Sequence, residues 1–371
     1  MDNEPYKEGR GGVLAAMSGG VDSSVAALIL KNQGYRVVGA TMRLLETIEE
    51  SFAPARSCCS ADDIMDARHV ALKLDFDHKV HNFSLAFRSE VIERFARDYF
   101  SGRTPNPCVD CNRRLKFSLL FQRAVFFDCA FMATGHYARV ELDKRSGRWL
   151  LKKALDLDKD QSYFLYGLTQ KELSRTLFPL GSLTKKEVRA LALSHNLVTA
   201  QKPESQDICF VRTGRYDSFL ESFGLKAKPG DIVDRRGRLL GHHKGLHRYT
   251  VGQRKGLGLC APNPLYVAAL DSSTNRVIVG REEELYSSSA IVSEVNFISV
   301  AKLSGLKEIE AKIRYRQNQF PALIEPLEPG PDRVRLIFNS PQRAVAPGQA
   351  AVFYQGDLVI GGGTIESAEL I

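Results

Sequence analysis

The sequence predicts an α/β fold: an N-terminal parallel sheet, a small central domain and a C-terminal antiparallel sheet or small barrel. Apolar strand patterns alternate with amphipathic helical patterns over residues 1–208, which is typical of a parallel sheet with crossover helices. The chain then becomes rich in Gly, Arg, Lys and His, and from residue 283 it is strand-rich with frequent turns. We therefore expect domains at 1–208, 209–282 and 283–371.

Composition restricts the class of protein. The chain has 371 residues, enough for two or three domains, and its 44% apolar and 25% charged residues are ordinary for a soluble globular protein. It shows no apolar run long enough to span a membrane and no signal-peptide pattern, so we expect a cytoplasmic protein with no membrane association. Seven cysteines in such a chain favour catalytic or metal-binding thiols. The formal net charge of +8 permits a nucleic-acid partner.

The individual elements follow from the same patterns. We expect strands at 13–17, 36–42, 78–83 and 130–134, and helices at 22–32, 61–73, 85–99, 112–126 and 184–195. The last helix opens with a capping box from Thr184 to Glu187. A hairpin is expected within 137–154, and further strands within 310–317, 332–339 and 349–365.

The stretch SGGVDSS, Ser18 to Ser24, lies between the first strand and the first helix. The amide groups at a helix N-terminus favour an anion, and Gly19 and Gly20 let a phosphate approach the backbone. Asp22 would repel that phosphate unless a cation stood between them, which suggests Mg²⁺. No Lys follows in a Walker A frame, so transfer of a γ-phosphate is not indicated. A tight turn with a serine cap is the simpler alternative.

Three cysteines are candidates for chemistry. Cys108 and Cys111 form a CxxC on a proline-stiffened loop that runs into a helix, and Cys209 lies in KPESQDICF. A thiolate at a helix N-terminus near Arg113 and Arg114 would be reactive. A structural zinc site normally needs two such pairs, so it is not expected. We expect structural roles for the adjacent Cys58 and Cys59, and taken alone Cys209 also fits one.

Ten separated stretches resemble the bacterial tRNA-specific 2-thiouridylase (MnmA-type) family of the ATP-pyrophosphatase superfamily. They are AMSGGVDSSVAALIL, CCSADDIMDARHVA, TPNPCVDCNRRLKF, ATGHYARV, DKDQSYFL, PLGSLTKKEVR, KPESQDICF, YTVGQRKGLG, RYRQ and PGQAAVFY, in the family's order. The resemblance implies an ATP-pyrophosphatase domain, a central domain and a C-terminal β-barrel. It also implies that ATP adenylates O2 of the wobble uridine in tRNA and that sulfur then replaces this oxygen. The implied products are 2-thiouridine, AMP and pyrophosphate.

The resemblance also implies roles for single residues. ATP would contact Ala16, Met17, Ser18, Gly19, Gly20, Val21, Asp22, Ser23, Met42 and Gly135. Cys209 would carry a persulfide, and Cys111 would release its sulfur by forming a disulfide with Cys209. The target base, which must leave its stack, would face Asn106, Pro107 and Cys108. The tRNA would contact His136, Lys159, Asp160, Gln161, Arg314, Tyr315 and Gln349. Independently of the family, Gly-flanked Arg254 and Lys255 suit a phosphate backbone, although an ordinary exposed loop is the alternative.

One position departs from the family. Many members have an acid, with a proposed general-base role, where this chain has Cys108. Two routes for sulfur therefore stay open: a persulfide on Cys209, or a [4Fe–4S] cluster on Cys108, Cys111 and Cys209 that presents sulfide from its open iron. ATP and Mg²⁺ are expected in both. The expected partners are tRNAs for Lys, Glu and Gln, and a sulfur donor that is a cysteine desulfurase or a relay protein.

Two rival functions share some of these features. A small-molecule ATP-pyrophosphatase would need neither the cysteine pair nor a basic C-terminal barrel. A non-catalytic RNA-binding protein would not need the intact SGGVDS loop.

Overall fold

The computed structural model describes residues 11–46, 60–204, 208–211, 216–223, 227–328, 330 and 332–371. The chain forms two compact units, the first from residues 1–90 and 110–213 and the second from 91–109 and 214–371. Residues 91–109 therefore belong to the second unit, although residues 110–213, which follow them in sequence, belong to the first. The domain boundaries 1–208, 209–282 and 283–371 stay a prediction. Cys58 and Cys59 lie outside the described residues.

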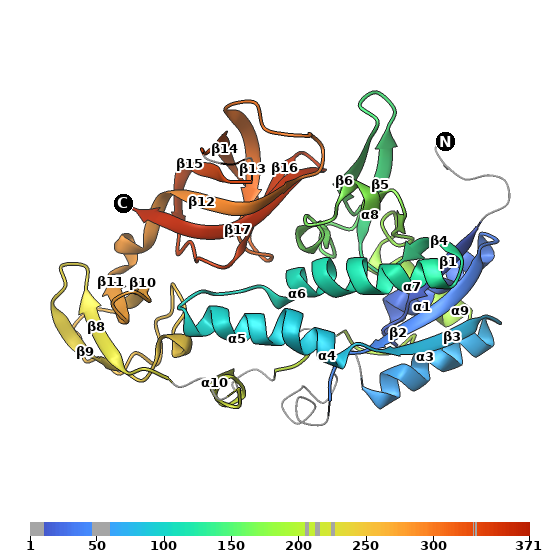
Figure 1. Ribbon diagram of the computed structural model, residues 1–371, viewed down its shortest axis with the longest axis horizontal. Helices are drawn as coiled ribbons and strands as arrows, with labels where there is room; N and C mark the ends of the chain where they lie inside the picture. The colour runs from blue at the N-terminus through green and yellow to red at the C-terminus, as the bar shows by residue number, and fades with distance from the viewer. Residues whose placement is uncertain are drawn as a thin grey trace. The chain divides into compact units, whose positions relative to one another are not determined.

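The first unit is built on a parallel sheet, which confirms the predicted fold class. The strand order is β3-β2-β1-β4-β7 (Figure 1). The bounds are β1 Gly12–Ala16, β2 Arg36–Arg43, β3 Asp77–Asn82, β4 Cys129–Ala133 and β7 Thr176–Leu177. β1 is buried on both faces, as its apolar run predicts, and pairs with β2 and β4 on either side. β7 was not predicted, since two residues carry no period-2 pattern.

Helices cover this sheet close to their expected places. The bounds are α1 Val21–Asn32, α3 Ala61–Lys73, α8 Gln170–Leu173 and α9 Lys185–Ser194, with a 3₁₀ turn at Ser162–Phe164. The capping box at Thr184 is confirmed: its hydroxyl accepts the amide of Glu187, and the Glu187 carboxylate accepts from Thr184. The hairpin is formed by β5 Ala138–Asp143 and β6 Arg148–Lys153. α1 and α9 pack together over a core that includes Val25, Leu28 and Val188.

Two predicted helices differ in detail. The helix expected at 85–99 consists of α4 Ser84–Phe87, a π-helical turn at Arg88–Ile92 and α5 Glu93–Phe100. The helix expected at 112–126 begins earlier, at Pro107. It runs through α6 Pro107–Asp110, π-helical turns at Cys111–Leu120 and α7 Phe121–Phe126. The interpretation that the CxxC lies on a loop is therefore wrong. Pro107 occupies the first helical position, where its missing amide costs no hydrogen bond, so the helix already contains both cysteines.

The second unit contains a four-stranded sheet in the order β10-β11-β8-β9. The bounds are β8 Gly230–Asp234, β9 Leu239–His243, β10 Tyr266–Asp271 and β11 Arg276–Gly280. The unit also has α10 Tyr216–Glu221 and short 3₁₀ turns at Leu246–Arg248 and Glu282–Leu285. The ring of Phe100, at the end of α5, stacks on His247 with centroids 4.4 Å apart.

The C-terminal strands of the second unit form an antiparallel barrel, as the family resemblance implied. The order is β12-β15-β14-β13-β16-β17, and pairing of β12 with β17 closes it (Figure 1). The bounds are β12 Tyr286–Phe297, β13 Lys307–Lys312, β14 Phe320–Pro326, β15 Val334–Arg343, β16 Ala350–Gln355 and β17 Leu358–Leu370. Closure leaves this barrel without an open sheet edge.

The strand expected at 310–317 ends early, at Lys312. The chain turns there, and the amide of Gln317 donates to the carbonyl of Arg314 at 3.2 Å. Alternation therefore stops, and Tyr315 is half-buried beside the Lys312 ammonium instead of facing the barrel core with Ala311. In the described part of the chain, no helix is long and apolar enough to cross a membrane.

Candidate nucleotide and sulfur-transfer site

The SGGVDSS loop connects the end of β1 to the first turn of α1, in the first unit. Ser23 Oγ donates to the carbonyl of Gly20 at 3.0 Å and accepts from the amide of Ser18 at 3.2 Å. Ser24 Oγ also donates to Gly20 O, at 2.9 Å. No side chain caps the N-terminus of α1, because Gly20 occupies the cap position. The serines therefore shape the loop from within, and the leading amides of α1 stay available to an anion.

Two glycines of this site are required by close packing. Gly19 has φ +71, and a Cβ built on it would lie 2.1 Å from the carbonyl oxygen of Asp63 on α3. A Cβ on Gly135 would lie 2.7 Å from the amide nitrogen of Ser23. In contrast, a Cβ on Gly20 would meet only Ser18 Oγ at 3.6 Å. Gly19 and Gly135 thus let α3 and the end of β4 approach the loop closely.

The carboxylate of Asp22 is neutralised by a lysine from a distant helix. Lys185 Nζ lies 2.7 Å from Asp22 Oδ1 and 2.8 Å from Oδ2, and the hydroxyl of Tyr137 donates to Oδ1 at 2.8 Å. Burial and the adjacent Asp22 charge raise the pKa of Tyr137, so its hydroxyl stays protonated and donates. The cation that the sequence required beside Asp22 is thus present within the chain, whether or not Mg²⁺ joins it.

The carboxylate of Glu204 forms ion pairs with two lysines. Its Oε1 lies 3.0 Å from Lys185 Nζ and its Oε2 lies 2.8 Å from Lys159 Nζ. Burial alone would favour the neutral acid, but the hydrogen bonds from Lys159 and Lys185 outweigh it and lower the pKa of Glu204. The site therefore contains a continuous chain of ion pairs, Asp22–Lys185–Glu204–Lys159.

Lys202 makes a second link, to α3. Its Nζ lies 2.6 Å from Asp63 Oδ1 and 2.5 Å from Asp66 Oδ2. Burial disfavours the ammonium, but the two carboxylates outweigh it and raise the pKa of Lys202. The backbone of Asp63 lies next to Gly19 of the phosphate loop. Lys202 therefore links its own segment to the side of the loop that faces α3.

Thr41, next to Met42 on β2, binds the backbone just before the SGGVDSS loop. The hydroxyl of Thr41 donates to Met17 O at 2.7 Å and lies 2.8 Å from His78 Nε2. Its one proton goes to Met17, so His78 must donate from Nε2 and carry no proton on Nδ1. Burial, with the nearby positive charge of Arg68, lowers the pKa of His78 to about 4. Met42, predicted to lie against adenosine, is buried on β2.

The predicted cysteines are divided between the units. Cys111 and Cys209 belong to the first unit and Cys108 to the second, because the division falls between Val109 and Asp110. Cys108 is exposed, Cys111 is buried and Cys209 is partly exposed. Immediately after Cys209, Phe210 is fully buried, and its ring meets Phe87 edge-on at 5.6 Å. The structure therefore anchors the segment of Cys209 on its C-terminal side.

The described ranges contain no group of three or more His, Cys, Asp or Glu side chains placed to hold a metal ion. These ranges therefore show no preformed set of ligands for the [4Fe–4S] cluster of the alternative route. A Mg²⁺ ion that accompanies ATP needs less, because it is usually held by one or two carboxylates and the phosphates. Asp22 fits that requirement.

The residues of the first unit that were predicted to contact tRNA have internal partners. His136 Nδ1 lies 2.6 Å from Thr134 Oγ1, and burial together with Lys116 lowers the pKa of His136, so its ring is neutral. Asp160 is buried, and its carboxylate accepts from Ala154 N, Ser162 N and Ser162 Oγ. Gln161 Oε1 accepts from the amide of Tyr137 at 3.0 Å. These side chains therefore stabilise the local structure of the first unit, and their contact with tRNA stays a prediction.

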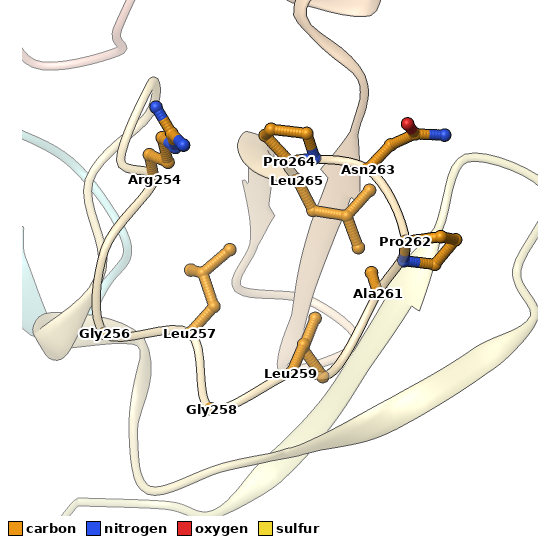
Figure 2. Close-up of a pocket in the computed structure, with 10 residues that line it drawn as sticks. All are labelled: Arg254, Gly256, Leu257, Gly258, Leu259, Ala261, Pro262, Asn263, Pro264 and Leu265. Atoms are coloured by element: carbon orange, nitrogen blue, oxygen red, sulfur yellow. The ribbon is translucent and has the colours of Figure 1, made fainter.

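In the second unit, Arg254 and Lys255 are exposed on a structured loop. The side chain of Gln253 organises it, accepting from Thr250 N and donating to Lys255 O, each at 3.0 Å. Arg254 and residues of the following chain, from Gly256 to Leu265, line an open pocket of about 400 Å³. Figure 2 shows Leu257, Leu259 and Leu265 pointing toward the middle of this arc, and the amide of Asn263 pointing away. Many of its lining residues are Gly, Pro or Leu, yet most of the surface that they expose to the pocket is polar.

The remaining predicted residues of the second unit are partly enclosed. Arg314 Nη2 donates to the carbonyls of Arg343 and Ala344, and Gln349 Nε2 donates to Thr104 O at 2.7 Å. Gln349 thereby holds the segment just before Asn106 and Pro107 against the barrel. Asn106 is half-buried and Pro107 is buried at the helix start. Their contact with the target base stays a prediction.

Sequence reasoning missed Tyr137, Lys185, Lys202 and Glu204. Lys185 was seen only within a capping box, and the pair with Asp22 spans 163 positions along the chain. One signal was available: a lone acid in a phosphate loop requires a cation, and that cation need not be a metal ion.

Comparisons with known proteins agree with this architecture. A family model described as tRNA methyl transferase HUP domain matches residues 11–213. Two further models, tRNA methyl transferase PRC-barrel domain and Aminomethyltransferase beta-barrel domain, match 217–281 and 287–365. A tRNA-specific 2-thiouridylase MnmA 1 from Thermoanaerobacter pseudethanolicus is 48% identical over 95% of this chain and 97% of its own. A tRNA-specific 2-thiouridylase MnmA from Moorella thermoacetica is 49% identical over 96% of this chain and 100% of its own.

Proposed function

This chain belongs to the MnmA family of tRNA-specific 2-thiouridylases, and we propose that it converts the wobble uridine of tRNA to 2-thiouridine with cleavage of ATP to AMP and pyrophosphate. The observation that carries the proposal is the placement of the SGGVDSS loop, Cys111 and Cys209 in one compact unit. A phosphate loop activates an oxygen, and a thiol pair delivers sulfur, so the unit contains both halves of the reaction.

The chemistry requires activation first. The C2 carbonyl of uridine is a poor electrophile, and its oxygen is a poor leaving group. Attack of O2 on the α-phosphorus of ATP releases pyrophosphate and leaves the oxygen bonded to AMP. The amides at the start of α1, which no side chain caps, suit the phosphates, and the Lys185 ammonium offsets the repulsion between them and Asp22. Mg²⁺, when bound, would screen the remaining charge between Asp22 and the phosphates.

Sulfur transfer follows in the persulfide route. The outer sulfur of a Cys209 persulfide attacks C2, and AMP leaves. The thiolate of Cys111 then attacks the inner sulfur of Cys209, which breaks the sulfur–sulfur bond, leaves sulfur on the base and forms a Cys111–Cys209 disulfide. An external thiol reduces this disulfide before the next turnover. The base must leave its stack to be reached, and Asn106, Pro107 and Cys108 are the residues proposed to face it.

The route through a [4Fe–4S] cluster is tested separately. Protein stripped of iron is supplied with ATP, Mg²⁺, unmodified tRNA and a persulfide donor. The persulfide route predicts full formation of 2-thiouridine without iron. Activity that returns only after anaerobic reconstitution with iron and sulfide would instead make Cys108 a third essential cysteine.

The partners are proposed on the same basis. The substrates are tRNAs for Lys, Glu and Gln, and the donor is a cysteine desulfurase or a sulfur-relay protein. The exposed side chains of Arg254 and Lys255 suit the tRNA backbone.

The function is tested by product analysis. AMP and pyrophosphate should form only when tRNA is present, and 2-thiouridine should appear in equal amount. Release of AMP without tRNA, driven by a small molecule, would favour a small-molecule ligase. A complete lack of tRNA-dependent AMP release would favour a non-catalytic RNA-binding protein.

A further inference from the structure

We infer that Tyr137 is a positioning residue that transmits nucleotide binding at the SGGVDSS loop to Gln161, in the segment proposed to contact tRNA. The inference rests on the proposed function, because that function assigns ATP to the loop and tRNA to Lys159–Gln161. The sequence assigned no role to Tyr137. Asp22, Tyr137 and Gln161 all belong to the first unit.

Tyr137 contacts the loop with its side chain and Gln161 with its backbone. Its hydroxyl donates to Asp22 Oδ1 at 2.8 Å. Its amide donates to Gln161 Oε1 at 3.0 Å, and its carbonyl accepts from the amide of Gln161 at 2.9 Å. Tyr137 is only 2% exposed and belongs to the core that contains Val25 and Val188. A single buried residue therefore connects Asp22 to Gln161 through three hydrogen bonds.

The partners of Asp22 give the direction of the effect. Among the described residues, its carboxylate binds Lys185, which contacts both oxygens, and Tyr137, which contacts Oδ1 alone. Phosphates at the start of α1 attract the Lys185 ammonium, so Asp22 then depends more on the Tyr137 hydroxyl, and this charge-assisted hydrogen bond strengthens. Mg²⁺, when bound, can use Oδ2 and leave the Tyr137 contact in place. Nucleotide binding should therefore hold Tyr137 more firmly.

A more firmly held Tyr137 orders Gln161. Both hydrogen bonds between the two residues involve the Tyr137 backbone, so restricting Tyr137 restricts the backbone and the side chain of Gln161 together. The neighbouring Asp160 carboxylate accepts from Ala154 N and from Ser162, which keeps the rest of this turn in place. The tRNA then meets a segment that is already ordered, and the entropy lost on binding is smaller. The nucleotide and the tRNA should thus bind cooperatively.

A second connection reaches the same segment. It consists of ion pairs and runs from Asp22 through Lys185 and Glu204 to Lys159. Glu204→Gln weakens this second connection and leaves the phenol in place, whereas Tyr137→Phe removes only the hydroxyl. The two variants therefore separate the effect of the phenol from the effect of the ion pairs.

The test is hydrogen exchange at the amides of Tyr137 and Gln161, which both donate within this connection, read by mass spectrometry of short peptides from the full chain. Exchange is measured with and without Mg²⁺ and a saturating ATP analogue that cannot be cleaved between the α- and β-phosphates. In the unsubstituted protein, the analogue should slow exchange at these amides by about fivefold or more, the lower range of allosteric coupling. The response should be lost in Tyr137→Phe and kept in Glu204→Gln.

Tyr35→Phe is the matched control, because Tyr35 belongs to the same core but follows the C-terminal end of α1, whereas Asp22 lies in its first turn. This variant should respond like the unsubstituted protein. The same coupling should appear in filter binding of unmodified tRNA. The analogue should lower the Kd for tRNA by about fivefold in the unsubstituted protein and in Tyr35→Phe, and leave it unchanged in Tyr137→Phe.

Several outcomes would overturn the inference: unchanged or faster exchange in the unsubstituted protein, a full response in Tyr137→Phe, or a lost response in Glu204→Gln or Tyr35→Phe. The unsubstituted protein alone can overturn it, so a folding defect in Tyr137→Phe would not protect it. Failure of the proposed function is seen separately, as a lack of 2-thiouridine formation by the unsubstituted protein. Protein that forms 2-thiouridine but shows no slowing of exchange would refute only the role of Tyr137.

Discussion

The ammonium of Lys185 lies within 2.8 Å of both carboxylate oxygens of Asp22. This pair places an ammonium, balanced by the Asp22 carboxylate, at the N-terminal turn of α1, where phosphates are expected. Because the Lys185 side chain is largely buried, its charge is screened less than that of a surface lysine.

Replacing Lys185 by Met should lower tRNA-dependent AMP formation by about 10- to 100-fold, the loss expected for a hydrogen bond to a charged group. Lys186→Met is the matched control, because this neighbouring lysine is exposed and its replacement removes the same charge. Steady-state AMP release checks both variants. Equal losses would show that overall charge, and not the position of Lys185, is responsible.

Two adjacent glycines should respond very differently to alanine. Gly19→Ala places a Cβ against the Asp63 carbonyl at positive φ and should lower the free energy of unfolding by about 2–4 kcal/mol. Gly20→Ala has room and should cost less than about 1 kcal/mol. Urea denaturation measures both. Similar stability of the two variants would contradict the packing of α3 against the loop.

Lys255 and Arg314 should have separable effects on tRNA binding. Lys255 is exposed, so Lys255→Gln should reduce the slope of log affinity against log salt by about 0.7–0.9 and leave the melting temperature unchanged. Arg314 donates to the carbonyls of Arg343 and Ala344, so Arg314→Gln should also lower the melting temperature. Filter binding at several salt concentrations and thermal unfolding check both. An unchanged slope for Lys255→Gln would remove that residue from the interface.

His78 should make stability depend on pH. Burial holds its pKa in the folded state at about 4, below the unfolded value of 6.5. Between these values the unfolded chain binds the proton and the folded chain does not, so stability falls as pH drops from 6.5 toward 4. His78→Gln should make this fall shallower. Urea unfolding of the unsubstituted protein and of His78→Gln at about pH 7.5 and about pH 5 measures the difference, and an equal fall in both proteins would refute it.

Features set by neighbouring residues were predictable from the sequence. The apolar run of β1, the glycine–serine loop and the capping box at Thr184 each depend on residues a few positions apart. All three lie where the sequence predicted them. The turn after Lys312 in the barrel was not predicted. Within it the side chain of Arg314 binds carbonyls at the end of β15, a contact between separate segments that a local pattern does not reveal. The π-helical turns at Cys111–Leu120 were also missed, since a period of 3.6 residues was assumed.

In the candidate site, too, local sequence patterns predicted some features and not others. The loop residues, Cys111 and Cys209 were identified from local patterns and a family resemblance. The ion pairs that join them were not, because each partner alone resembles an ordinary exposed charge. Only tertiary structure brings Asp22, Lys185 and Glu204 together.

The most direct measurement is the 2-thiouridine content of the wobble nucleoside after purified protein, ATP, Mg²⁺ and a persulfide donor act on unmodified tRNA. Nucleoside mass spectrometry should show conversion by the unsubstituted protein and none by Cys209→Ser or Cys111→Ser. Conversion by Cys209→Ser at the normal rate, or none by the unsubstituted protein while AMP is released, would contradict the account.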